Sequence, residues 1–122
     1  MKLNKDCIRD LLLYLEENLN YKDKVTINTL KLKNYTKDEL MYTADRLIEA
    51  NYINAKICWN SMTSYLIVVN SLTYIGHQFL DTIRDDGIWK ETKSKASKIA
   101  SISLPILQEL AASFIKTKLG LI

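Results

Sequence analysis

The side chains of this sequence that could bind a metal are few and scattered. The single histidine, His77, lies four residues before Asp81, a spacing that would put both side chains on one helical face. A metal site needs at least one further ligand, and neither Cys7 nor Cys58 lies near His77 in the sequence. We therefore interpret His77 as a packed, hydrogen-bonded structural residue, and we expect no metal site.

Acidic residues gather near one expected helix end, at Asp81, Asp85 and Asp86, where they could be imagined as catalytic acids. Arg84 stands beside them, so helix capping or ion pairing is the commoner role. The chain has no Ser-His-Asp spacing, no glycine-rich phosphate loop and no Cys-x-x-Cys pair. We expect a protein that is not an enzyme and that holds no cofactor.

Lysines are the residues that could contact phosphate, and they collect in two stretches, residues 22–37 and 90–98. Such runs form either a solvated face or a surface that binds nucleic acid. Under the second alternative the candidate nucleic-acid-binding residues are Lys22, Lys24, Lys31, Lys33, Lys37, Lys56, Lys90 and Lys93. Trp59 could be an exposed contact residue, whereas Trp89 lies in an apolar run typical of a core.

Composition indicates one globular domain: 122 residues, 48% hydrophobic and 25% charged, with a net charge of +3. Three glycines and one proline are too few for a linker-rich chain. Two cysteines and an amino terminus without a signal peptide predict a reduced, cytoplasmic protein. Residues 57–80 carry no charge, but polar residues interrupt them, so we expect no membrane span.

Helical periodicity predicts a first helix over residues 5–18 and a second over residues 37–50. Thr36 and Glu39 have the spacing of a capping box at the start of the second helix. Between the two helices, residues 20–35 read as a loop with a short extended piece at residues 25–27.

A two-stranded hairpin is predicted next, because residues 52–57 and 65–69 are rich in β-branched and aromatic side chains. Residues 60–64 would form its turn, and Asn70 and Ser71 would end it. Thr73 is placed to cap a third helix, which we expect to terminate at Gly87.

Two further helices are predicted. One begins at Ile88 and carries lysines on its solvent-exposed face, and the other extends from Ser103 to Gly120. The last helix is apolar around more than one stripe, so it must be covered on two sides. It packs either within its own chain or against a second copy in a homodimer. The candidate dimer-interface residues are Leu107, Leu110, Phe114 and Ile115.

These elements describe a mainly α fold with a small β-hairpin, an α+β class, in a single domain over residues 1–122. Their order resembles a winged-helix domain at residues 5–87, followed by a helical extension at residues 88–122. Residues 35–53 resemble the recognition helix of bacterial winged-helix regulators, with Asn51 at the usual glycine position. This resemblance implies contact with double-stranded DNA.

The whole chain also resembles an uncharacterised family of small proteins from phages, prophages and Gram-positive bacteria, the domain of unknown function numbered 2513. The residues that carry this resemblance are the opening residues 1–17 and residues 72–81 (LTYIGHQFLD), followed by residues 83–86 and by Trp89-Lys90. The resemblance covers nearly the full chain and implies no activity.

Charge separates two hypotheses about function. The helix at residues 37–50 has four carboxylates against Lys37 and Arg46, the wrong sign for a helix that enters DNA. The first hypothesis is a non-catalytic, DNA-associated or transcription-regulatory factor. The alternative is a protein interaction module whose acidic helix docks a basic partner.

Overall fold

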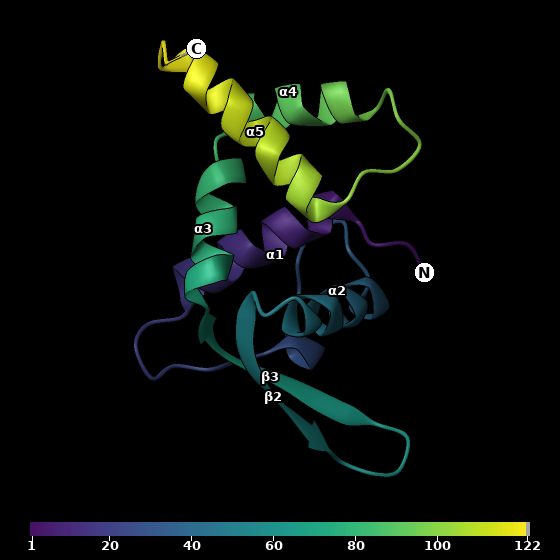
Figure 1. Cartoon of the computed structure of the whole chain (residues 1–122). Coiled ribbons are helices and arrows are strands. Elements are labelled where there is room, and N and C mark those ends of the chain that lie inside the picture. Colours follow the sequence, from purple (N-terminus) through teal and green to yellow (C-terminus); the bar gives the residue numbers. More distant parts are fainter. Residues whose placement is uncertain (122) are drawn as a thin grey trace. The chain divides into compact units, whose positions relative to one another are not determined.

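A computed structural model describes residues 1–121 and shows an α+β fold with five α-helices and a small antiparallel sheet, as expected (Figure 1). The elements are α1 (Lys5–Asn18), β1 (Val25–Thr26), the 3-10 turn η1 (Ile27–Thr29), α2 (Lys37–Glu49), β2 (Ile53–Trp59), β3 (Tyr65–Leu72), α3 (Tyr74–Ile83), α4 (Asp86–Ala96) and α5 (Leu104–Lys118).

Two compact units make up the chain, residues 1–77 and residues 78–122. We expected a core at residues 5–87 and an extension from residue 88. The boundary between the two compact units lies between His77 and Gln78, within α3.

The first unit has its core between α1, α2 and the sheet. Leu11 and Leu15 of α1, Leu40 and Leu47 of α2, and Ile67 of β3 are all buried. Each helix carries its apolar residues three or four positions apart, so one stripe faces the core and the other side meets water. The bounds of α1 agree with the predicted residues 5–18.

The second helix begins and ends with specific caps. Its capping box is confirmed: Glu39 N–H donates to Thr36 Oγ1 at 3.1 Å, and Thr36 N–H donates to Glu39 Oε1 at 3.2 Å. At its end Asn51 has φ +63°, while Tyr52 N–H donates to the Leu47 carbonyl. This is the Schellman arrangement, and Asn fills the glycine position because it tolerates a left-handed backbone.

Strand β3 lies at the centre of the sheet, in the order β1-β3-β2, with both neighbours antiparallel. We predicted that the hairpin ends at Asn70 and Ser71, but β3 continues to Leu72. The pairing persists because Asn54 lies opposite Ser71 and donates from Nδ2 to Ser71 Oγ at 3.0 Å. The register shifts between Asn54 and Ala55, which pair with Ser71 and Val69. Asn70 of β3 is therefore the extra residue of a β-bulge.

The loop predicted at residues 20–35 contains β1 and, unexpectedly, η1. Asn28 of η1 continues the sheet with its side chain. Its Nδ2 donates to the Tyr65 carbonyl at 2.9 Å, and its Oδ1 accepts from Ile67 N–H at 2.9 Å. The amide group therefore supplies the donor and acceptor that a longer β1 would have supplied.

The start of α3 is confirmed, since Gly76 N–H donates to Thr73 Oγ1 at 2.9 Å. The predicted end at Gly87 is wrong. The helix stops at Ile83, and Gly87 lies in the first turn of α4. The Asp85 carboxylate accepts from Ile88 N–H at 2.9 Å and starts α4, so Gly87 is helical and needs no left-handed backbone.

In the second unit α4 packs along α5. Ile88, Trp89, Leu107 and Ala111 are buried there. Gly120 ends α5 with φ +76°, as expected. Among residues 1–121 no helix is long and apolar enough to cross a membrane.

Candidate functional site

The turn end of the hairpin is joined to α2 by one short hydrogen bond. Tyr65 at the start of β3 donates from its hydroxyl to Asp45 Oδ2 at 2.7 Å. This bond, more than burial, raises the pKa of the Tyr65 hydroxyl, and the nearby charge of Arg46 opposes the rise. The start of β3 therefore lies directly beside the middle of α2.

Arg46, the one arginine of α2, contacts two other side chains of the same helix. Arg46 Nε lies 2.6 Å from Glu49 Oε1, and the guanidinium carbon lies 5.1 Å from the centre of the Tyr42 ring. The carboxylate of Glu49 offsets the positive charge of this arginine, which weakens its attraction for a phosphate. The accessible face of α2 is therefore acidic in its charge balance.

The hairpin places large apolar side chains in the solvent next to this helix. Trp59 is 63% exposed, and its ring centre lies 4.8 Å from that of Tyr65. Ile57 pairs with buried Ile67 and Trp59 pairs with Tyr65, so both lie on the side of the sheet that faces α2. Met62, in the turn, is 98% exposed.

We call this region the helix–hairpin surface. It comprises Tyr42, Asp45, Arg46, Glu49, Ile57, Trp59 and Tyr65. Sequence reasoning identified the acidic helix and Trp59 but missed the bond from Tyr65 to Asp45. A tyrosine in a strand and an aspartate twenty positions earlier in a helix leave no periodic signal in a sequence.

All eight lysines predicted to bind nucleic acid are exposed, but none belongs to the helix–hairpin surface. Lys22 and Lys24 line an open groove of about 560 Å³ beside Tyr21 and Asn70. Lys56 lies opposite Val68 on the other side of the sheet from Trp59. The other predicted lysines of the first unit are Lys31 and Lys33, which follow η1, and Lys37, which begins α2.

The remaining two predicted lysines, Lys90 and Lys93, lie in the second unit on α4. Lys93 Nζ lies 5.8 Å from the centre of the Trp89 ring. Trp89 itself is buried, as its apolar setting predicted.

The predicted dimer residues have unequal access to a second subunit. Leu107 is only 1% exposed, so its side chain is not available for contact with another copy. Leu110, Phe114 and Ile115 are half-buried. Ile106, which we did not select, is 49% exposed on the same helix.

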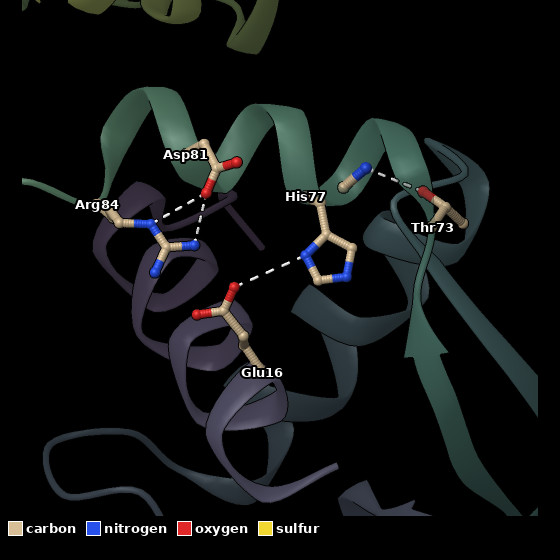
Figure 2. Close-up of polar contacts among 6 residues, drawn as sticks. Glu16, Thr73, His77, Asp81 and Arg84 are labelled. Carbon is tan, nitrogen blue, oxygen red and sulfur yellow. Dashed lines mark hydrogen bonds and ion pairs between the residues drawn. The ribbon is translucent and has the colours of Figure 1, made fainter. Parts of the chain in front are cut away.

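The interpretation of His77 as a packed residue is wrong. Its side chain is 48% exposed, and its Nδ1 lies 3.7 Å from Glu16 Oε2, an ion pair when the imidazole is protonated (Figure 2). Asp81 is held by Arg84 instead, with Nη2 at 2.6 Å and Nε at 3.1 Å from Oδ1. The buried positions of α3 include Phe79 and Leu80, and His77 falls on the solvent side.

Two polar contacts of α1, one buried and one partly buried, also escaped sequence reasoning. Thr43 Oγ1 donates to Cys7 Sγ at 3.3 Å, and burial raises the pKa of this thiol. Tyr35 donates from its hydroxyl to Asp10 Oδ2 at 2.6 Å. Throughout residues 1–121 no three His, Cys, Asp or Glu side chains are grouped to hold a metal ion.

Comparison with known proteins gives a family and no activity. Residues 2–103 match the family described as Hypothetical protein (DUF2513). An uncharacterized protein of Haemophilus influenzae is 29% identical over 121 residues, covering 98% of this chain and 100% of that protein. No solved structure matches the chain significantly. Because the family match extends over most of its length, the chain belongs to the DUF2513 family.

Proposed function

We propose that this chain is a non-catalytic protein interaction module of the winged-helix type, which binds a basic protein partner through its helix–hairpin surface. The order helix, strand, helix, hairpin, helix and the sheet order β1-β3-β2 support the winged-helix assignment. The turn η1 then stands where the middle helix of such a domain would lie.

The observation that carries the proposal is the pairing of an acidic helix with exposed aromatic and aliphatic side chains. Protein interfaces are enriched in tryptophan, tyrosine, methionine and arginine, with charge at their rims. Trp59 and Ile57 would fill apolar pockets of the partner, and Glu49 would face its cations. A DNA duplex offers phosphates, which the carboxylates of α2 would repel.

Two substitutions with matched controls test the proposal. A tagged chain is expressed in its own host cells, and copurified proteins are identified by mass spectrometry. We expect Trp59→Ala and Glu49→Lys each to abolish recovery of a protein that the unmodified chain retains. Tyr21→Ala and Glu17→Lys, which remove an exposed aromatic ring and an exposed carboxylate elsewhere, should leave recovery unchanged. Equal recovery by all five forms would contradict the proposal.

A second candidate function, binding of double-stranded DNA, is favoured by a different face. Thr26 and Lys56 both pair with Val68, which places them on the face of the sheet opposite Trp59. Lys22 and Lys24 precede β1 and line a groove with Asn70 and Ser71, near the end of β3. Phosphate contacts made by these lysines would weaken as salt rises.

A gel-shift series with random duplex DNA at low and moderate salt tests this second candidate. Binding through the sheet face predicts that Lys24→Ala and Lys56→Ala both weaken the shift and reduce its salt dependence. Lys116→Ala, an exposed lysine on α5, serves as the control. Absence of a shift even at low salt would exclude DNA binding by this route.

A further inference from the structure

The second unit contains a basic groove that the proposed function does not use. It lies along α4 and is bordered by Phe114 of α5, with a volume of about 640 Å³. Its lining residues are Gly87, Lys90, Glu91, Ser94, Lys95, Lys98 and Phe114. The lining positions from Gly87 to Lys95 lie on one face of α4, and Lys98 follows just after the helix ends at Ala96.

The charge of this groove is strongly one-sided. Three lysines and a single glutamate line it, and Lys90, Lys95 and Lys98 are all exposed. Lys93, on the same helix, is absent from the lining and lies near the ring of Trp89. The positive charge is therefore concentrated on the side of α4 that faces Phe114.

The groove is lined by an aromatic ring as well as by lysines. Phe114 is half-buried and forms part of the lining, and the methylene stems of lysines cover apolar surface while their ammonium groups stay in water. A phosphate backbone needs only cations. A peptide that alternates carboxylates with leucine-like side chains matches both the lysines and the ring.

We propose that the groove between α4 and α5 binds an acidic amphipathic segment of a partner protein. An apolar side chain of that segment contacts Phe114, and its carboxylates contact Lys90, Lys95 and Lys98. Together with the helix–hairpin surface, which is directed at a basic partner, the groove gives the chain two binding surfaces of opposite charge preference.

Fluorescence anisotropy with the full chain tests this inference. The probe is a short labelled peptide in which leucines at helical spacing alternate with aspartates and glutamates. We expect it to bind, with Lys90→Gln and Lys98→Gln each weakening affinity about two- to fivefold, as for exposed ion pairs. Lys116→Gln, an equal charge change outside the groove, should have no effect.

Peptide affinity of the Phe114→Leu and Phe114→Ala variants tests the apolar contact. Circular dichroism shows whether both variants fold. If Phe114→Ala does not fold, a peptide with its leucines replaced by serine tests the same contact from the other side. We expect the serine peptide to bind at least tenfold more weakly.

Three results would overturn the proposal. The first is equal binding of the leucine and serine peptides, which would indicate charge attraction alone. The second is a duplex oligonucleotide that displaces the peptide and loses affinity with Lys90→Gln. The third is self-association abolished by Lys90→Gln, which would place the acidic α2 of a second copy in the groove.

Discussion

Gly76 is constrained by the backbone of the segment that follows α2. A Cβ atom at this position would lie 2.0 Å from the carbonyl oxygen of Tyr52. That carbonyl also accepts from Thr73 N–H at 3.0 Å, and Thr73 Oγ1 donates to the Asn51 carbonyl at 2.6 Å. The start of α3 and the end of α2 are thus held together by contacts that leave no space for a side chain.

Substitution of Gly76 by alanine should therefore be costly. We expect Gly76→Ala to lower the free energy of unfolding by about 3 kcal/mol, because backbone must move to relieve the contact. Gly120→Ala meets open space but has φ +76°, so it should cost only about 1 kcal/mol. Urea denaturation of both variants compares the two effects, and equal losses would contradict the steric argument.

The hydroxyl of Tyr35 makes the free energy of unfolding depend on pH in the alkaline range. Burial, followed by the hydrogen bond to Asp10 and its negative charge, raises the pKa of Tyr35. The folded chain therefore holds this proton more tightly than the unfolded chain does. The stabilisation is complete below about pH 10, the pKa of a free tyrosine, and is lost as pH rises toward the folded-state value.

Tyr35→Phe should lower the free energy of unfolding by about 1 kcal/mol near neutral pH, because it removes the hydrogen bond to a partly exposed carboxylate. Above about pH 10 the difference between variant and parent should shrink. Tyr74→Phe, at an exposed position, should leave neutral-pH stability unchanged. Guanidinium titrations over a pH series give these values, and a constant difference at all pH values would refute the linkage.

In addition to the core and the strand pairing, two single side chains join elements of the first unit. Asn28 extends the two-residue strand β1 by bonding to β3, and Tyr65 joins β3 to α2. A two-residue strand has too few ladder hydrogen bonds to hold its edge of the sheet by itself. The asparagine side chain thus adds two hydrogen bonds to the burial of Ile27 in holding η1 against β3.

Asn28→Ala should destabilise the protein by about 2 kcal/mol, since it leaves the Ile67 amide and the Tyr65 carbonyl without this partner. Asn28→Asp keeps the acceptor for Ile67 N–H but places a carboxylate oxygen opposite the Tyr65 carbonyl oxygen, so it should also destabilise the protein. Hydrogen exchange at the Ile67 amide should accelerate in the alanine variant and stay slower in the aspartate variant. Unchanged exchange in both would contradict the anchoring role.

At the scale of the whole molecule, charge and apolar surface are distributed by unit. The first unit holds the helix–hairpin surface, and the second holds the basic groove and the exposed Ile106 of α5. The homodimer predicted from α5 must use side chains other than Leu107, which is buried. Ile106 is exposed and Leu110, one turn later, is half-buried, so both side chains remain accessible on this helix.

Sedimentation equilibrium tests the predicted homodimer. We expect a mass of twice 14.1 kDa for the parent chain and a monomer for Ile106→Lys, because a buried lysine would break an apolar interface. Met62→Lys, at an exposed methionine in the hairpin turn, should leave the dimer intact. A monomeric parent at all concentrations would refute the dimer, and equal peptide affinity in parent and Ile106→Lys would show that the α5 seam and the groove are separate.

Local chemistry explains why much of the fold could be predicted from the sequence. Helical periodicity located α1 and α2, and the capping residues Thr36 and Thr73 lie within three positions of the amides they bind. Asn51 and Gly120 marked helix ends because few residue types tolerate a positive φ. The wrong prediction at Gly87 also has a local cause. Asp85 caps a new helix, so Gly87 lies in the first turn of α4 and does not end α3.

The candidate sites depended on contacts that no spacing encodes. The acidic sign of α2 and the lysine content of α4 are properties of the sequence alone. Tertiary structure decided that Tyr65 and Trp59 lie beside α2 and that Phe114 completes the groove on α4. Hydrogen bonds within a helix join residues a few positions apart, whereas these surfaces form only when distant segments bury a common core.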